Sequence, residues 1–349
     1  MIYPENRYPL FGIMLEPNEG HGMKRLVLAA AVAAAFALGW GLEAAQAQTY
    51  PTRPITLVVP FAAGGPTDTI ARLVGQAMGV KLGQTVLIEN ITGAAGSIGV
   101  GRVARAAPDG YTLGIGHWST HVVNAAVYPL QYDVLNDFAP ISLIANNPQL
   151  IVSKNAVPAK NLKELIAWVK ANQDKVTQGT AGAGSASHIG GIFFQQLTGT
   201  KFQFVPYRGT GPVMQDLLAG NIDLTFDQAA NSLPQVRAGQ IRAYAVTAKT
   251  RLAAAPDIPT VDEAGLPGFY IAVWHGLWAP KGTPKEIIAK LVDAVHAALA
   301  DPNVRKRLAE LGQDIPPPDQ QTPEALYAHH KAELEKWLPI IKAANIKLN

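Results

Sequence analysis

Short apolar runs that end in glycine turns dominate the chain after residue 50. Ile55–Pro60 reads ITLVVP and is followed by Gly64-Gly65-Pro66, which predicts a buried strand ending in a turn. Apolar residues at helical spacing occupy Ile70–Met78, and either Thr67 or Asp68 can cap that helix. The same pattern predicts two further strands at Val86–Glu89 and Tyr111–Gly116. This alternation is the β-α-β rhythm of a parallel sheet.

The middle of the chain repeats this rhythm and predicts a second α/β sheet. Asn161 and Glu164 form a capping-box pattern that predicts the start of a helix between two of its strands. Its strands are predicted at Leu150–Val152, Val176–Thr180, Phe202–Pro206, Ile222–Phe226 and Ala243–Thr247.

The last part of the chain is mostly helical. Trp274–Pro280 is the final predicted strand. Three helices follow, each predicted to have proline at its first position behind a capping residue: Thr283-Pro284, Asp301-Pro302 and Thr322-Pro323. We expect these helices to pack back onto the first sheet. The pattern therefore predicts an α/β protein of two lobes with a ligand cleft between them. We expect the chain to cross from the first lobe to the second near 146–150 and to return within 248–275.

The N-terminus has the features of an export signal. Met23-Lys24-Arg25 is basic, Leu26–Leu42 is apolar, and Ala45-Gln46-Ala47 offers the small residues that a signal peptidase reads. An uncleaved membrane anchor is the alternative, but the run is alanine-rich and shorter than the roughly 20 residues of a span. The predicted divisions are an upstream extension at 1–22, a signal peptide at 23–47, the first lobe at 48–148 and 252–349, and the second lobe at 149–251.

Composition restricts the function without naming it. Of 349 residues, 48% are hydrophobic and none is cysteine, which leaves room for a large core and excludes disulfides and thiolate metal sites. Cleavage after Ala47 removes three of 29 basic and four of 26 acidic residues, so the net charge changes from +3 to +4. This mild, unclustered excess gives no support for nucleic-acid binding. It is compatible with an anionic small ligand.

Glycine turns are the most informative candidates for ligand binding. The segments 61–68 and 93–97 each join a predicted strand to a predicted helix, at the edge of an open sheet where ligands usually bind. Their backbone N–H groups and helix N-termini suit a carboxylate, although a plain tight turn explains each loop equally well. In the second lobe, 180–188 and 207–210 offer hydroxyl and amide groups. Arg208 there could pair with a carboxylate or be a surface charge.

Enzyme and metal-site interpretations find less support. Ala95-Gly96-Ser97-Ile98-Gly99 lacks the first glycine of a nucleophile elbow, and no phosphate-binding or dinucleotide-binding motif is present. His117 and His121 are four residues apart, yet no third metal ligand is obvious nearby, so hydrogen-bonding roles in a polar loop are favoured over metal binding. His329-His330 is predicted to be solvated. Asp68 is interpreted as a helix cap more readily than as a ligand contact.

Taken together, short motifs along the chain resemble the tripartite tricarboxylate transporter receptor family, of the TctC or Bug type. The resemblance runs from about Tyr50 to the C-terminus, and the order and spacing of its motifs make it specific. The motifs are Tyr50-Pro51, Arg53-Pro54-Ile55, Val59–Pro66 with Asp68, Glu89-Asn90, Gly93–Gly96, Pro108–Leu113, Ser119–His121, Tyr132-Asp133, Asp137–Ile141, Val205–Gly209, Ile258–Val261, Glu263–Gly265, Gly276-Leu277, Ala279-Pro280 and Gly282–Pro284.

The resemblance implies a periplasmic binding protein of the type II fold that is not an enzyme and needs no cofactor or metal. It implies a small carboxylate held between the two glycine loops, partly through water, and integral-membrane transporter subunits as partners of a monomeric receptor. The ligand could be a dicarboxylate, a tricarboxylate, an acidic amino acid or an aromatic acid. The implied ligand-binding residues are Phe61, Ala62, Ala63, Gly64, Gly65, Thr67, Asp68, Thr92, Gly93, Ala94, Gly96, Ser97, Ser119, Thr120, Thr180, Ser185, Ser187, His188, Tyr207, Arg208 and Asp227.

Two departures from the family's pattern bear on the choice of ligand. The family often has lysine where Arg208 stands, and small polar residues where His117-Trp118 stand. A bulky aromatic side chain near the cleft could favour an aromatic acid or simply pack on the lobe. A sensor subunit for a membrane signalling partner is the alternative function, and an exported hydrolase is a third hypothesis.

Overall fold

The computed structural model describes residues 50–343, which fold around one continuous mixed sheet. Among these residues, eight strands pair in the order β2-β1-β3-β9-β4-β7-β5-β6, and β8 pairs with β4. The strands are β1 (Ile55–Val59), β2 (Val86–Asn90), β3 (Thr112–His117), β4 (Phe138–Lys154), β5 (Thr177–Thr180), β6 (Gln203–Pro206), β7 (Leu224–Gln228), β8 (Ile241–Val246) and β9 (Ala272–Pro280). The two predicted α/β sheets are therefore joined into one.

The joining element is β4, a strand of 17 residues. Its first part pairs antiparallel with β9, and its last part pairs antiparallel with β7 and β8. The sequence pattern predicted only Leu150–Val152 of this strand, because Pro140, Asn146-Asn147 and Pro148 interrupt the apolar run. The register against β9 shifts between Pro140 and Ser142 and again between Leu143 and Ala145, which lets an irregular sequence remain in the sheet.

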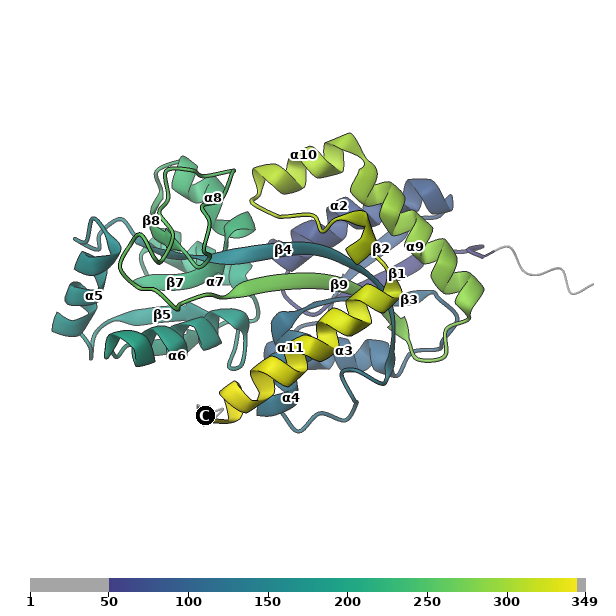
Figure 1. The fold of residues 1–349 in the computed structure, drawn as a ribbon, viewed down its shortest axis with the longest axis horizontal. Coiled ribbons are helices and arrows are strands. Elements are labelled where there is room, and N and C mark those ends of the chain that lie inside the picture. The colour runs from purple at the N-terminus through teal and green to yellow at the C-terminus, as the bar shows by residue number, and fades with distance from the viewer. Residues whose placement is uncertain (1–49, 344–349) are drawn as a thin grey trace, which may run out of the picture. The chain divides into compact units, whose positions relative to one another are not determined.

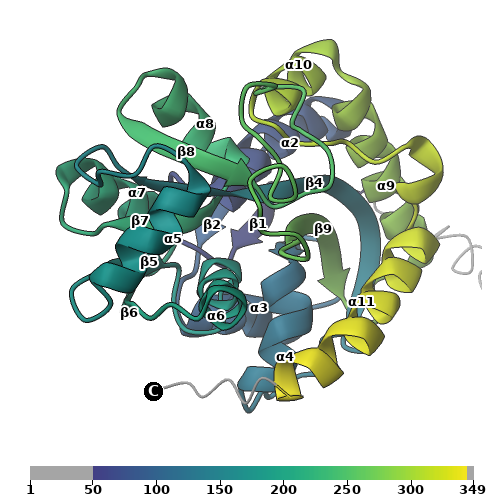
Figure 2. The same ribbon diagram turned by 60° about the vertical axis from the view of Figure 1, so that its left-hand side comes forward.

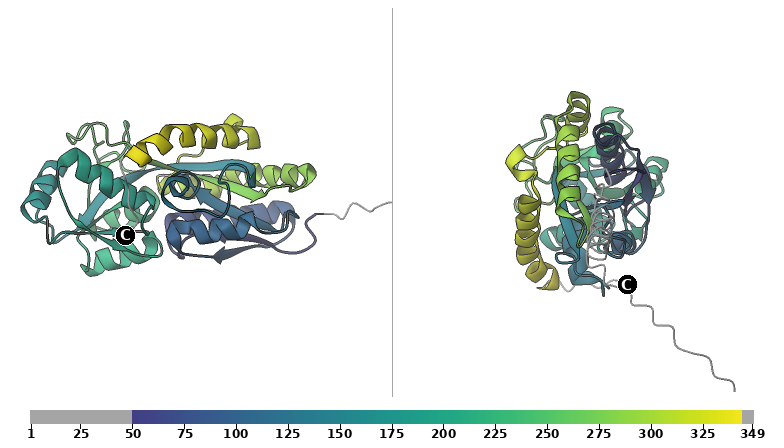
Figure 3. Two further views of the ribbon diagram at one scale, coloured as in Figure 1. Left: turned by 90° about the horizontal axis from the view of Figure 1, so that it is seen from below. Right: turned by 90° about the vertical axis from the view of Figure 1, so that its right-hand side faces the viewer.

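Helices gather around the two ends of this sheet and form two lobes (Figures 1 and 2). One lobe has α2 (Pro66–Leu82), α3 (Ser97–Ala104), α4 (Asn124–Val127), α9 (Lys285–Ala300), α10 (Pro302–Glu310) and α11 (Pro323–Ala343). The other lobe has α5 (Leu162–Ala171), α6 (Ala186–Thr198), α7 (Thr210–Ala219) and α8 (Ala229–Arg237). In Figure 3 the lobes lie side by side and β4 runs from one into the other.

Each lobe has apolar packing of its own, and a further cluster, which includes Val122 and Phe194, continues from one lobe into the other. In the first, Leu57 of β1, Val74 of α2 and Leu291 of α9 are buried together between the sheet and its helices. In the second, the rings of Phe194 and Phe226 lie 5.1 Å apart at the centre of an aromatic cluster. Burying such side chains is the main favourable term in folding. The two cores hold the strand ends in place, and the glycine turns follow those ends.

Several helix starts follow the predicted capping patterns. The Asn161 side chain accepts a hydrogen bond from the backbone N–H of Glu164, which confirms the capping box at α5. Asp301 caps α10 with Pro302 at the first helical position, also as predicted. Two predictions were wrong by a few positions. Pro284 precedes α9 instead of beginning it, and α2 is capped by Gly65, so Thr67 and Asp68 lie inside its first turn.

The C-terminal helix α11 packs onto the first lobe, as predicted. The rings of Trp337 and Trp118 are 4.9 Å apart, and Trp118 is fully buried, so it packs on the lobe away from the cleft. The prediction that His330 is solvated was wrong: its exposed fraction is 1% and its Nε2 lies 2.7 Å from the carbonyl oxygen of His121. Charged neighbours suggested an exposed segment, but one face of α11 covers the buried residues 118–123. No helix within residues 50–343 is long and apolar enough to cross a membrane.

Candidate functional site

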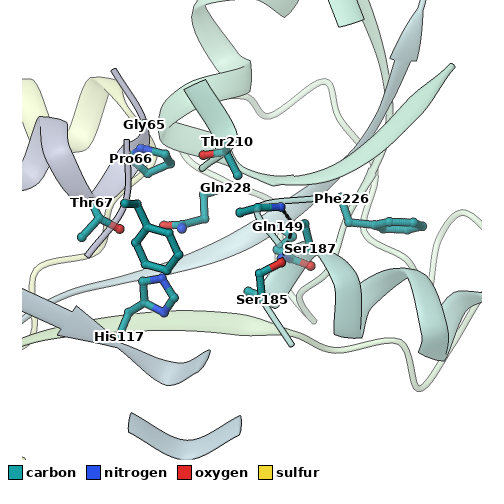
Figure 4. A pocket seen from close by; sticks show the side chains of 13 residues that line it. Gly65, Pro66, Thr67, His117, Gln149, Ser185, Ser187, Thr210, Phe226 and Gln228 are labelled. Atoms are coloured by element: carbon teal, nitrogen blue, oxygen red, sulfur yellow. Dashed lines mark hydrogen bonds between the residues drawn. The ribbon is translucent and has the colours of Figure 1, made fainter. Parts of the chain in front are cut away.

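A cavity lies where the first glycine loop meets the second lobe (Figure 4). Its walls enclose about 380 Å³ of space free of protein atoms, part of it open to solvent. Thirteen residues line it: Phe61, Gly65, Pro66, Thr67, His117, Gln149, Ala181, Ser185, Ala186, Ser187, Thr210, Phe226 and Gln228. Both lobes contribute, so the cavity occupies the cleft that the sequence predicted.

Three helices begin at this cavity. They are α2 behind Gly65, α6 behind Ser185, and α7 at Thr210. Gln228 of the lining precedes α8, but the first N–H of that helix, on Ala229, already donates to Asn147 Oδ1. The first N–H groups of a helix have no partner within it and carry a partial positive charge. No lysine or arginine is among the lining residues. An anion in the cavity would therefore be held by helix N-termini and amides instead of a basic side chain.

The start of α2 is fixed by a network behind the cavity wall. Asp68 accepts hydrogen bonds from the Gly64 N–H at 3.0 Å and from Arg72 Nε at 2.9 Å. Asn90 Nδ2 donates to both the Phe61 carbonyl and Asp68 Oδ1 at 2.9 Å. Burial acts to raise the pKa of Asp68, but the hydrogen bonds from Arg72, Gly64 and Asn90 outweigh it and hold the pKa below its usual value. Asp68 thus positions the loop and does not line the cavity.

On the opposite wall, the start of α6 is held by its own hydroxyl groups. Ser187 Oγ accepts the Ala181 N–H at 2.9 Å and lies 3.1 Å from Ser185 Oγ. The Gly184 N–H donates to His188 Nδ1 at 3.0 Å. Burial lowers the pKa of His188 to about 4, so this ring is neutral near pH 7. The wall therefore presents polar groups without adding charge.

His117, at the end of β3, contributes an uncharged donor to the cavity. Its ring stacks on Phe61 with centroids 4.9 Å apart and planes 4° from parallel. The Ser119 N–H donates to His117 Nδ1 at 3.1 Å, so Nδ1 bears the lone pair and Nε2 bears the proton of the neutral ring. Burial lowers the pKa of His117 to about 3. The ring is therefore a neutral hydrogen-bond donor, and it is buried, not part of a polar loop as the sequence suggested.

Two glutamines form the floor on the second-lobe side. Gln149 of β4 and Gln228 of β7 face each other as direct partners across the antiparallel strands. Both are buried and both line the cavity. Sequence reasoning missed them because the predicted strands, Leu150–Val152 and Ile222–Phe226, stop short of both residues. Phe226, two residues before Gln228, was predicted as the end of a strand and not as a residue of the binding site.

Five of the residues predicted to bind ligand line the cavity: Phe61, Gly65, Thr67, Ser185 and Ser187. The others lie around it. Arg208 is exposed, and its backbone carbonyl accepts the Ala62 N–H at 3.0 Å. The hydroxyl of Tyr207 donates to Asp216. Ala63 and Gly64 are exposed at the rim, while Thr180 and Thr120 are buried behind the walls.

The second glycine loop, 92–97, lies beside the cavity without lining it. Ala94 and Ala95 have positive φ angles of 45° and 47°, an unfavourable conformation for residues with a Cβ. Asn124 holds this loop: its Nδ2 donates to the Ala95 carbonyl at 3.0 Å and to Ser97 Oγ at 2.9 Å. A Cβ added to Gly182 of the second lobe would lie 3.7 Å from Ala95 Cα, so this loop also faces the other lobe.

Asp227 lies next to the cavity and is buried. Its Oδ2 accepts hydrogen bonds from Ser232 Oγ at 2.6 Å and Asn231 Nδ2 at 2.8 Å. Burial raises the pKa of Asp227 to about 7, although these hydrogen bonds act in the opposite direction. Asn231 Nδ2 also lies 3.3 Å from the carbonyl of Thr210, which connects Asp227 to the lining of the cavity.

The geometry does not assemble a metal site from His117 and His121. His121 stacks on Trp278 at 3.8 Å, and its Nδ1 lies 2.9 Å from Thr120 Oγ1. Within residues 50–343, no group of three or more histidine, cysteine, aspartate or glutamate side chains could hold a metal ion.

Comparison with known proteins agrees with this geometry. The family model for the tripartite tricarboxylate transporter family receptor, TctC, matches residues 70–346. The structure of the periplasmic binding protein BugD superposes with a TM-score of 0.83 at 42% identity, covering 85% of this chain and 99% of BugD. The two-lobed fold is thus that of a periplasmic binding protein.

Two further structures carry ligands. MatC of Rhodopseudomonas palustris, with bound malate, has a TM-score of 0.81 and 42% identity, covering 84% of this chain and all of MatC, 100%. A second protein of R. palustris, with adipate, has a TM-score of 0.80 and 35% identity, covering 85% of this chain and 99% of its own. The chain therefore belongs to the tripartite tricarboxylate transporter receptor family, and it is a periplasmic solute-binding protein of the TctC or Bug type.

Proposed function

We propose that this protein captures a small carboxylate in the cavity between its lobes and delivers it to a membrane transporter. The observation that carries the proposal is the convergence of the starts of α2, α6 and α7 on a cavity without basic side chains. A helix N-terminus is a ready-made site for an anion, and three of them supply charge compensation that one would not. Two related proteins hold malate and adipate, which are both small carboxylates.

The cavity suits a small acid better than a large one. The space between its walls is small, about 380 Å³ even with open solvent at the mouth included, so a compact ligand fits it better than a bulky one. Phe61 and Phe226 add apolar surface between the polar groups of the two walls. An acid with a short carbon chain between its polar ends would contact both kinds of surface. A large aromatic acid would not gain a partner in Trp118, which packs against α11.

Binding without catalysis is part of the proposal. The serines near the cleft lack the arrangement of a hydrolase, in which a histidine accepts the proton of the nucleophile. Ser97 Oγ accepts a hydrogen bond from Asn124, and Ser185 Oγ contacts Ser187 Oγ. Ser119 does contact His117 Nδ1, but that nitrogen already accepts the Ser119 N–H, and the ring nitrogen that faces the cavity carries the proton.

The remaining assignments complete the proposed receptor. We place the export signal at 23–47, outside the described residues, so that the receptor is released into the periplasm as a monomer. We place the lobe boundaries near 148 and 252. The second glycine loop, from Thr92 and Gly93 to Gly96 and Ser97, would reach the ligand through bridging water, together with Ser119 and Thr120.

A library of small carboxylates tests the proposal by thermal shift and calorimetry on the purified protein. Binding to the native state adds about 2.7 kcal/mol to the free energy of unfolding when the ligand is at a hundredfold excess over Kd. The unfolding temperature rises as a result. A Gly65→Val variant should lose the shift, since a Cβ at Gly65 already lies 3.2 Å from Thr210 Oγ1 and the added methyls would wedge the lobes apart. Gln76→Ala, on the exposed face of α2, is the matched control. No hit in the library, or full affinity in Gly65→Val, would contradict the proposed site.

Delivery is tested separately from binding. Deleting the gene in the source organism should abolish uptake of the acid identified in the screen, and restoring the gene should recover it. Uptake that persists while a transcriptional response to the acid is lost would instead identify the protein as the ligand-binding subunit of a sensor.

A further inference from the structure

A tyrosine of the first lobe reaches across the cleft to the second lobe. Tyr128 directly follows α4, and its hydroxyl donates a 2.6 Å hydrogen bond to the backbone carbonyl of Ala183, shortly before α6 begins. A carbonyl oxygen only accepts hydrogen bonds, so the tyrosine must be the donor. Burial raises the pKa of Tyr128 above its usual value, and the hydroxyl therefore keeps the proton that it donates.

The backbone around Ala183 packs closely against the same segment of the first lobe. Gly184 has a φ angle of 84°, and a Cβ added to it would lie 3.0 Å from Val127 Cγ2 and 3.2 Å from Tyr128 Cε2. Contacts this short leave no room for a side chain at Gly184. The hydrogen bond therefore lies within a packed contact between the lobes and does not bridge open space.

The Tyr128 contact connects two parts of the binding region without entering the cavity. On the second lobe, the Ser185 N–H donates to the Gly182 carbonyl at 3.0 Å, which places Ala183 in the turn just before a residue that lines the cavity. On the first lobe, the Tyr128 N–H donates to the carbonyl of Asn124, whose side chain holds the second glycine loop. Tyr128 is not among the residues that line the cavity.

The hydrogen bond between Tyr128 and Ala183 can exist only while the lobes are together. Hydrogen bonds between a hydroxyl and an oxygen are 2.5–3.0 Å long, so a separation of the lobes by about 1 Å at this point would break it. A contact that is present in only one of two conformations stabilises that conformation relative to the other. The bond therefore favours the closed arrangement of the lobes.

We propose that Tyr128 is a latch that keeps the lobes closed over the ligand and so sets the rate at which the ligand is released. The inference rests on the proposed function, because the ligand is what the closed lobes retain. Tyr128 is a positioning residue, since it acts through the turn that begins α6 and not through contact with the ligand. Its effect should therefore be the same for every ligand. It should also leave association unchanged, because a ligand enters before the bond forms.

Rates of ligand binding and release test the latch. Tyr128→Phe removes the hydroxyl and keeps the ring. In stopped-flow experiments with the acids found in the library screen, its dissociation rate should be about fivefold higher, which is the effect of one neutral hydrogen bond. The association rate should not change, and Kd should rise by the same factor for each acid. Tyr244→Phe is the matched control, because the Tyr244 hydroxyl lies 3.3 Å from the Ala159 carbonyl within the second lobe; its loss should leave the release rate unchanged.

A second measurement needs no ligand. The chain contains no cysteine, so Arg102→Cys and Gln196→Cys place one spin label at an exposed position on α3 and one on α6, which belong to different lobes. Pulsed electron paramagnetic resonance then measures the distance between the labels in the unliganded protein. Adding Tyr128→Phe should move the distribution of distances towards longer values, and adding Tyr244→Phe should not.

The outcomes separate the latch from the function beneath it. An unchanged dissociation rate, or an unchanged distance distribution, in Tyr128→Phe would overturn the latch and leave a carboxylate receptor. Losses of affinity that differ from acid to acid would make Tyr128 a residue that recognises the ligand, and would overturn the latch as well. A distribution that shifts as expected, in a protein that binds no acid of the library, would support the latch and remove the proposed function.

Discussion

The backbone N–H of Ala62 donates a 3.0 Å hydrogen bond to the carbonyl oxygen of Arg208 and so joins the two lobes at the rim of the cavity. Nearby, a Cβ added to Gly211 at the start of α7 would lie only 2.9 Å from the Ala63 carbonyl oxygen. The glycine loop and α7 are therefore in backbone contact, and this contact brings the N-termini of α2 and α7 to the same cavity. The closeness of the loops depends on the absence of a side chain.

Replacing Gly211 with alanine should weaken ligand binding without unfolding the protein. Its Cβ would push against the Ala63 carbonyl and separate the starts of α2 and α7, so we expect at least about a tenfold loss of affinity, or roughly 1.4 kcal/mol. Calorimetry with the acid found in the library screen measures the loss. Gln215→Ala, on the exposed side of the same helix, should bind normally. Unchanged affinity in Gly211→Ala would show that the contact is not needed for binding.

Buried histidines should make the protein lose stability in acid. Burial lowers the pKa of His117 to about 3 and the pKa of His330 to about 4, against about 6.5 in an unfolded chain. As the pH falls below 6.5 the unfolded state binds these protons and the native state does not, so each histidine removes about 1.4 kcal/mol of stability per pH unit. Asp227 opposes this between about pH 4 and 7, because its raised pKa lets the native state bind a proton first.

The unfolding temperature should therefore fall clearly between pH 6.5 and pH 4.5, since the buried histidines with lowered pKa values outnumber the two carboxyl groups, Asp227 and Asp314, whose pKa values burial raises. His330→Gln keeps a group able to hydrogen-bond the His121 carbonyl and removes one titrating site, so its stability should decline less steeply over the same range. Thermal melts of both proteins from pH 4 to pH 8 measure the two slopes. Parallel curves would mean that His330 is not held neutral in the folded state.

Asp227 should make ligand affinity depend on pH near neutrality. Its pKa of about 7 means that it is mostly protonated at pH 6 and mostly ionised at pH 8. An ionised carboxylate beside the cavity repels an anionic ligand, so affinity should fall a few-fold as the pH rises from 6 to 8. Asp227→Asn keeps the shape and removes the charge. Calorimetry at both pH values should show the dependence in the unmodified protein and a flat response in Asp227→Asn; a flat response in both would place the pKa outside this window.

The fold was predictable to a large extent because the strands of the two lobes end in glycine turns and carry strong apolar runs. Ile55–Pro60 and the capping pair Asn161 and Glu164 each specify their element locally, and the structure has both. The strand β4 was mostly missed because Pro140, Asn146-Asn147 and Pro148 interrupt its apolar run, although pairing with β9, β7 and β8 keeps these positions in the sheet. The position of β4 in the sheet therefore depends on contacts with strands that are distant in the sequence, and no local apolar period predicts it.

The cavity was predictable only in part, for a related reason. Phe61, Gly65 and Ser185 belong to turns that local chemistry singles out, and they line the cavity. Gln149 and Gln228 are ordinary polar residues until two strands place them opposite one another. His330 was misjudged because its burial depends on residues 118–123, which α11 covers and which lie far from it in the sequence. The charged residues next to it in the sequence lie on the outer face of the same helix.

The absence of a basic side chain from the cavity lining has a consequence for how cargo leaves. A lysine in the site would attract the ligand's carboxylate with a full positive charge whether the lobes were open or closed. Release of the ligand would then have to overcome that attraction. The attraction proposed here is divided among partial charges on separate helices, α2 on one lobe and α6 and α7 on the other. Such charges act only over about the first turn of a helix. Rotating the lobes apart would therefore remove part of the electrostatic attraction on the ligand. A transporter that opens the lobes would release the ligand without having to compete with a charged side chain for it.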